Sequence, residues 1–90
     1  MTSEQLQDLL LMTAGMGGET GELLEKIKKS VRDGGITPAE IKKELGDVIY
    51  YWVRIAKFYG FTANSIIEDN VSKLESRFAR GVIRGSGDNR

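Results

Sequence analysis

Two pairs of acidic residues are the part of this sequence best suited to chemistry. The first pair is Glu19 and Glu22, and the second pair is Glu44 and Asp47. The two members of each pair are three positions apart, so on a helix their carboxylates lie on one face, a single turn apart. Four carboxylates that converge in this way repel one another and need a cation. Because carboxylate oxygens are hard ligands, the pairs predict a site for Mg²⁺, for which Mn²⁺ could substitute.

The alternative interpretation is that these four carboxylates are ordinary solvated charges, because Glu-x-x-Glu occurs by chance in many helices. Two features favour a metal site. Each pair encloses a glycine, Gly21 or Gly46, which weakens a helix but removes side-chain bulk beside the carboxylates. Each pair also adjoins apolar residues, so we expect it to face a neighbouring helix rather than bulk water.

The composition excludes several other kinds of chemistry. The chain has no cysteine and no histidine, which removes disulfides, thiolate zinc sites and the commonest general base. Its 13 acidic and 13 basic residues balance, which does not favour a nucleic-acid partner. No apolar run approaches the roughly 20 residues that cross a bilayer, and no signal peptide is evident. We therefore expect no membrane partner and a cytoplasmic protein.

The apolar spacing that positions the first acidic pair is helical. One helical stretch covers about residues 3–16, with Ser3 as its N-cap, and a second covers about residues 18–31. Glycines near the junction could separate two helices, or could lie in one long helix where another backbone approaches closely. We favour a kinked or nearly continuous helix that ends at Asp33-Gly34-Gly35.

The second acidic pair belongs to a helix with a well-defined beginning. Thr37 is the expected N-cap, Pro38 takes the first helical position, and Glu40 completes a capping box. The helix is expected to reach about Tyr59. Its apolar residues cover more than half of its circumference, which predicts a central helix or one that contacts a second subunit.

A last helix is predicted from Thr62 to about Ala79, followed by an irregular basic tail over residues 80–90. The fold class is therefore all-α: a small antiparallel bundle of three to four helices in one domain, residues 1–90. A chain this short buries only a modest core, so we expect oligomerisation to complete the bundle.

Three polar residues of the last helix could bind phosphate. Asn70, Lys73 and Arg77 are spaced by three and four positions and share one face. A solvated face with local ion pairs explains this spacing equally well. Beside a metal site, however, Lys73 offers phosphate oxygens a point charge, and Arg77 offers a bidentate fork.

Tyr51 stands four positions after Asp47, on the face of the acidic pair. It could stack on or hydrogen-bond a sugar or a base, or it could simply pack. The glycines at positions 15, 17 and 18 do not make a phosphate loop, because no Gly-Lys-Ser/Thr follows them.

The ordered set of motifs resembles a known family. Residues 18–24 (GETGELL), residues 44–48 (ELGDV) and residues 70–77 (NVSKLESR) look like those of the MazG-like nucleoside triphosphate pyrophosphohydrolases, in the all-α NTP pyrophosphatase superfamily. The resemblance extends from about Leu10 to Arg90. It implies a helical bundle that assembles as a homodimer or homotetramer. It also implies hydrolysis of a (deoxy)nucleoside triphosphate to the monophosphate and diphosphate.

The resemblance assigns roles to the candidate residues. It implies that both acidic pairs, Glu19, Glu22, Glu44 and Asp47, hold Mg²⁺. Glu22 and Glu44 are the expected catalytic residues, with Glu22 as the first choice for orienting the attacking water. The same resemblance implies that the phosphates or the sugar of the substrate are bound by Asn70, Lys73 and Arg77, and the sugar by Tyr51.

Three alternatives remain open from the sequence. Phosphoribosyl-ATP pyrophosphatases share the fold and the acidic pairs, although the Asn70, Lys73 and Arg77 motif argues against them. The dimeric dUTP-hydrolysing branch is a second enzyme alternative, although its members are usually longer. A non-catalytic helical dimerisation module is the alternative from another class, and the presence of all four acidic positions argues against it.

Overall fold

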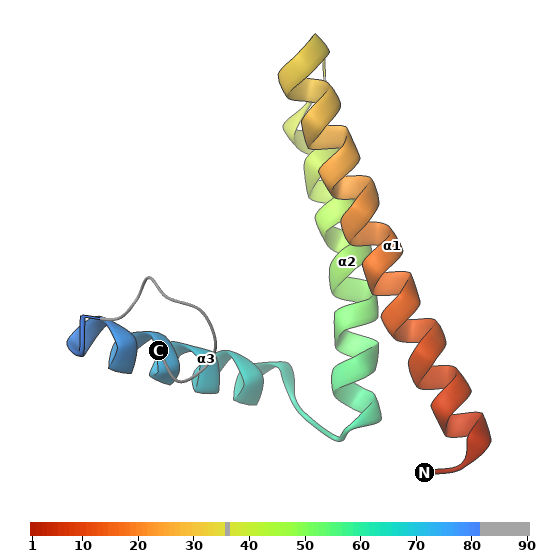
Figure 1. The fold of residues 1–90 in the computed structure, drawn as a ribbon, viewed down its shortest axis with the longest axis vertical. Helices are drawn as coiled ribbons and strands as arrows, with labels where there is room; N and C mark the ends of the chain where they lie inside the picture. Colours follow the sequence, from red (N-terminus) through yellow and green to blue (C-terminus); the bar gives the residue numbers. More distant parts are fainter. Residues whose placement is uncertain (36, 82–90) are drawn as a thin grey trace. The chain divides into compact units, whose positions relative to one another are not determined.

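The computed structural model describes residues 1–35 and 37–81. These residues form three helices and no strand: α1 (Ser3–Asp33), α2 (Pro38–Phe58) and α3 (Ala63–Ala79) (Figure 1). The predicted all-α class is confirmed. Most of the predicted tail, residues 82–90, lies outside the described residues. The chain divides into two compact units, Met1–Tyr59 and Gly60–Arg90, and its treatment as one domain stays a prediction.

The first two predicted helical stretches form one uninterrupted helix, α1, of 31 residues. Its N-cap is Thr2, so the prediction of Ser3 is wrong by one position. The hydroxyl of Thr2 accepts a hydrogen bond from the backbone N–H of Gln5, and the Gln5 side chain accepts one from the N–H of Thr2. If Ser3 were the N-cap, the residue three positions later would be Leu6, whose side chain has no hydrogen-bond acceptor. Only Thr2 can therefore form the capping box.

The other predicted helix boundaries are largely confirmed. The Thr37 hydroxyl accepts from the N–H of Glu40, whose carboxylate accepts from the N–H of Thr37, and Pro38 opens α2. The helix ends at Phe58, one residue earlier than predicted. Thr62 caps α3 by accepting from the N–H of Ser65.

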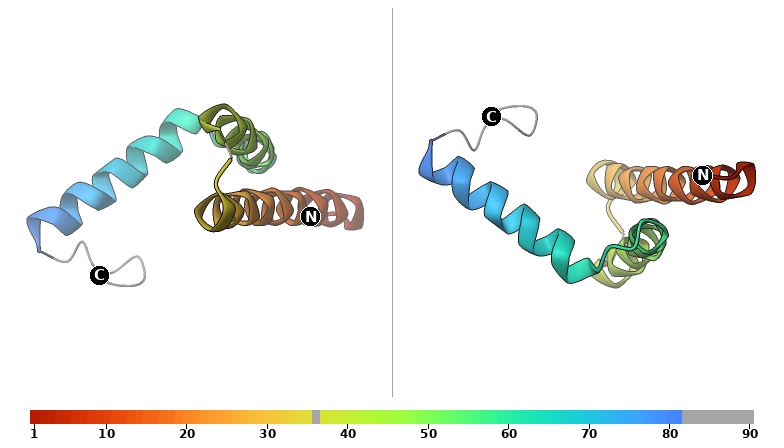
Figure 2. Two further views of the ribbon diagram at one scale, coloured as in Figure 1. Left: turned by 90° about the horizontal axis from the view of Figure 1, so that it is seen from above. Right: turned by 90° about the horizontal axis from the view of Figure 1, so that it is seen from below.

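Helices α1 and α2 form a hairpin and lie side by side, inclined to one another (Figures 1 and 2). Lys26 of α1 meets Glu44 of α2, whereas the earlier residue Gly15 meets the later residue Tyr51. The two helices thus pass each other in opposite directions. This hairpin brings Glu19 of the first acidic pair to Glu44 and Asp47 of the second pair.

Gly15 is the position where this hairpin requires a glycine. A Cβ atom added there would overlap Cε1 of the Tyr51 ring. Of the two alternatives for these glycines, one long helix with a close approach applies at Gly15, although a side chain makes this approach and not another backbone. By contrast, a Cβ added at Gly17 would have no neighbour within 4 Å.

We predict that Gly15→Ala lowers the free energy of unfolding by about 1–3 kcal/mol, because the Tyr51 ring must shift. The matched variant Gly17→Ala should raise it by roughly 0.5–1 kcal/mol, because alanine favours the helix and meets nothing. Urea denaturation followed by circular dichroism measures both changes. Equal stabilisation by the two substitutions would contradict the close contact at Gly15.

Candidate metal centre

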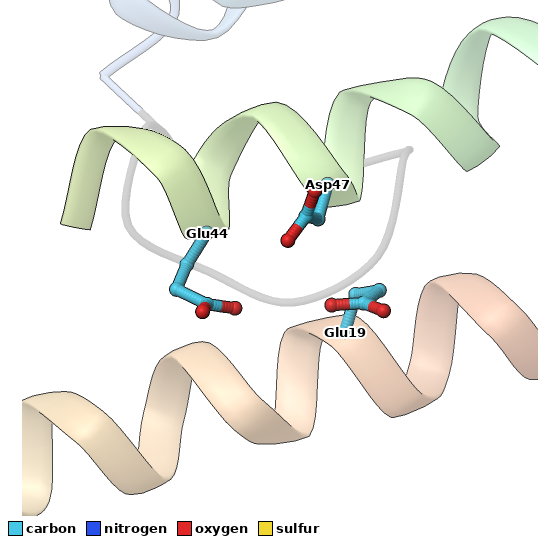
Figure 3. A group of neighbouring side chains, drawn as sticks. All are labelled: Glu19, Glu44 and Asp47. Atoms are coloured by element: carbon cyan, nitrogen blue, oxygen red, sulfur yellow. The ribbon is translucent and has the colours of Figure 1, made fainter. Parts of the chain in front are cut away.

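Three of the four predicted carboxylates converge across the hairpin. Glu19 comes from α1, and Glu44 and Asp47 come from successive turns of α2. One oxygen atom of each residue lies within 4.8 Å of the corresponding atoms of the other two (Figure 3). Figure 3 shows the three side chains directed into the space between the helices. We call these three residues the carboxylate cluster.

The carboxylate cluster is incompletely paired. Glu44 is only 5% exposed, and its Oε2 atom is buried without a hydrogen-bond partner. Oε2 of Glu19 is likewise buried without a hydrogen-bond partner. Desolvation raises the pKa of Glu19 above its usual value, and the negative charges of Glu22, Asp47 and Glu44 raise it further. The cluster therefore favours an additional positive charge.

A hard divalent cation fits this site. Its donors are carboxylate oxygens only, which suit Mg²⁺ or Mn²⁺ and not a thiolate-bound or imidazole-bound metal. The two orphaned oxygens are buried acceptors, and such groups are normally satisfied in folded proteins. Coordination of a metal ion would satisfy them.

Glu22 lies outside the carboxylate cluster. Its side chain is exposed, and its negative charge helps to raise the pKa of Glu19. The predicted roles of Glu22 as a fourth ligand and in orienting water stay predictions. Its exposure leaves it accessible to a substrate.

Lys26 belongs to the site and was missed by the sequence reasoning. Its Nζ atom donates a hydrogen bond to Oε1 of Glu44 at 2.6 Å, and this contact raises the pKa of Lys26. The signal was present in the spacing, because Lys26 follows Glu22 by four positions and so shares its face of the helix. Only the hairpin shows which carboxylate of α2 it meets.

Tyr51 packs within the hairpin. Its ring lies against Gly15 and meets the ring of Tyr50 edge-on, with 5.1 Å between the ring centroids. Of the two uses that the sequence left open, packing is the one that the described contacts show. A contact with the sugar stays a prediction.

The predicted phosphate-binding residues lie on α3, which belongs to the other compact unit. Arg77 is only 4% exposed, whereas Asn70 and Lys73 are exposed. A pocket of about 280 Å³ is lined by Ser72, Lys73, Ser76, Arg77 and Arg80. The pocket brings Lys73 and Arg77 together with a third cation and two hydroxyls, and Asn70 is not among its lining residues.

Among the described residues, no helix is long and apolar enough to cross a membrane.

Comparison with known protein families matches residues 7–81 to the MazG nucleotide pyrophosphohydrolase domain. The chain is also similar to the gene 37 protein of Mycobacterium phage L5. The two sequences are 40% identical over an alignment of 92 positions, and the alignment covers 97% of this chain and 81% of the phage protein. No solved structure matches the chain.

Proposed function

Because the chain belongs to the MazG nucleotide pyrophosphohydrolase family, we propose that it hydrolyses a (deoxy)nucleoside triphosphate between the α and β phosphates. The products are the nucleoside monophosphate and diphosphate, and the reaction depends on Mg²⁺. The observation that supports this proposal most is the convergence of Glu19, Glu44 and Asp47 with two orphaned buried oxygens. Such a site suits the metal ion that accompanies a triphosphate.

In this proposal the carboxylate cluster holds Mg²⁺, with Glu22 as a further ligand. Mg²⁺ held there would neutralise charge on the triphosphate and would make an attacking water easier to deprotonate. Glu44 is held in place by Lys26, so one of its oxygens stays directed into the cluster. Glu22, as an exposed carboxylate, accepts a hydrogen bond from the attacking water and orients it towards the phosphorus atom.

The positive charges of α3 indicate which residues would contact the phosphates of the substrate. Lys73 and Arg77 stabilise the negative charge that develops on the leaving diphosphate, and their shared pocket supports this role. Asn70 contacts a phosphate or the sugar, and Tyr51 contacts the sugar. We propose a nucleoside triphosphate, and not a nucleic acid, as the ligand of these residues.

A panel of nucleotides tests the proposal. The full chain is incubated with Mg²⁺ and canonical or damaged (d)NTPs, dUTP and phosphoribosyl-ATP, and the products are separated by chromatography. Release of monophosphate and diphosphate from (d)NTPs in general supports the proposal. Turnover of dUTP alone, or of phosphoribosyl-ATP alone, would assign the chain to that narrower activity. No turnover of any nucleotide would favour the non-catalytic dimerisation module.

We further propose that the chain functions as a homodimer or homotetramer. Among the described residues, the only buried apolar side chains are Met12 and Ala56, which is too small a core for a stable domain. Leu10, Leu11 and Ile49 are 67%, 70% and 58% exposed, so neither helix of the hairpin covers them. A second copy would bury these side chains and complete the bundle.

Light scattering coupled to size-exclusion chromatography measures the assembly. We predict a mass of two or four chains at micromolar concentration, and Ile49→Glu should shift this mass towards one chain because it places a charge in the contact. A wild-type monomer would contradict oligomerisation.

The proposed place of action is the cytoplasm. The relative from a mycobacteriophage supports a virus-encoded protein, which would act in the host cytoplasm on the nucleotides there. The proposal therefore includes no membrane and no nucleic-acid partner.

A further inference from the structure

The Lys26 contact with the carboxylate cluster does more than hold Glu44 in place, because it brings a positive charge to the candidate metal centre. The Lys26 Nζ atom donates to Oε1 of Glu44 at 2.6 Å, and the two residues are 18 positions apart in the sequence. Glu44 is buried, whereas 43% of the Lys26 side chain is exposed. Lys26 thus reaches from the edge of the hairpin to the most buried carboxylate of the cluster.

The contact uses only one side of the Glu44 carboxylate. Oε1 accepts from Lys26, while Oε2 is buried and has no hydrogen-bond partner. A buried carboxylate with no positive neighbour is costly, so Lys26 compensates Glu44 when no metal is bound. The oxygen that remains is available to a metal ion.

We propose that Lys26 is a built-in counter-cation of the metal centre, which compensates Glu44 in the metal-free protein and lowers the affinity of the centre for divalent ions. The inference depends on the metal centre of the proposed function. It assigns to Lys26 a positioning and tuning role through Glu44, and no contact with the substrate.

Two effects of Lys26 on metal affinity oppose each other. As a tether, it holds the Glu44 side chain in one conformation, which strengthens metal binding by the small entropy of one ordered side chain. As a cation, it would repel a doubly charged ion held by the same carboxylate, because the effective dielectric constant near a protein surface is still well below that of water. Repulsion should therefore outweigh ordering. The partial exposure of Lys26 also lets its ammonium group turn towards solvent when a metal ion binds.

This tuning has a consequence for the substrate. A centre with a low affinity for free divalent ions binds an ion more tightly when the ion arrives together with a triphosphate. The negative charge of the triphosphate then offsets the positive charge of Lys26. The centre then selects the metal–nucleotide complex over the free ion.

Titration of the full-length, metal-free protein with Mn²⁺ tests the inference, with binding followed by electron paramagnetic resonance of free Mn²⁺. We expect Lys26→Met to bind Mn²⁺ about tenfold more tightly than the wild type, because it removes the repulsion. Lys26→Arg keeps the charge and should bind like the wild type. Lys28→Met is the matched control, since Lys28 is an exposed lysine on the same helix, and it should also bind like the wild type.

The possible outcomes separate the two proposals. Weaker Mn²⁺ binding by Lys26→Met would show that Lys26 is a tether, and unchanged binding would show that it has no role; either result overturns the inference but leaves the metal centre standing. If neither the wild type nor Lys26→Met binds Mn²⁺, the metal centre itself fails, and the inference fails with it. If circular dichroism shows that Lys26→Met does not fold, Lys26→Gln replaces it as the uncharged variant, with the same expected result.

Discussion

Replacing Glu44 with glutamine is expected to abolish hydrolysis, with a loss of activity on the order of a thousandfold or more. Glu44 is the most buried member of the carboxylate cluster, and its Oε2 atom is orphaned. An amide at this position is neutral and is a poor ligand for Mg²⁺. The amide oxygen can still accept the hydrogen bond from Lys26, so the hairpin should remain folded. Diphosphate release under saturating Mg²⁺ and nucleotide measures the loss.

The matched control for this substitution is Glu25→Gln, because Glu25 is an exposed acid on α1 outside the cluster. It makes the same chemical change, and we expect it to keep full activity. The circular dichroism spectrum of Glu44→Gln should match that of the wild type. Full activity in a folded Glu44→Gln protein would exclude the carboxylate cluster as the metal centre.

Replacing Arg77 with lysine is expected to lower kcat/KM about ten- to hundredfold. A hydrogen bond between charged groups contributes about 1.5–3 kcal/mol, and lysine cannot reproduce the bidentate contact of a guanidinium with phosphate. Arg77 is buried and lines the α3 pocket with Lys73, so its side chain is held in place before a substrate binds. Steady-state kinetics with the preferred nucleotide measures the change.

The control for this variant is Arg32→Lys, because Arg32 is exposed and forms an ion pair with its neighbour Asp33. Its kcat/KM should equal that of the wild type. A loss in Arg77→Lys that follows a loss of helicity would indicate a structural role for Arg77. Unchanged kinetics in a folded Arg77→Lys protein would remove Arg77 from the substrate site.

The parts of the fold that could be predicted are those that depend on neighbouring residues. Thr37 and Thr62 cap their helices as expected, because a cap needs only a hydroxyl and a backbone N–H a few positions away. Ser3 was the wrong choice because the partner of the cap matters as much as the cap itself. The side chain of Gln5 accepts a hydrogen bond from the N–H of Thr2, whereas the side chain of Leu6 cannot accept one from Ser3.

The candidate site was predictable to the extent that helical spacing determines it. The spacing of three placed Glu44 and Asp47 together, and the order of the helices brought Glu19 to them. The partner of Lys26 and the contact of Tyr51 with Gly15 depend on the register of α1 against α2, that is, on the relative position of the two helices along their axes. No local pattern encodes that register, because many side chains along both helices create it together.

Phosphorus NMR of a single reaction tests the central claim most directly. The full chain is mixed with Mg²⁺ and a deoxynucleoside triphosphate, and the resonances of the α, β and γ phosphorus atoms are followed with time. We predict that the α resonance becomes that of a nucleoside monophosphate, while the β and γ resonances become the single resonance of diphosphate, and that removal of Mg²⁺ by a chelator stops this change. Appearance of orthophosphate and a nucleoside diphosphate, or an unchanged spectrum for every nucleotide of the panel, would contradict the account.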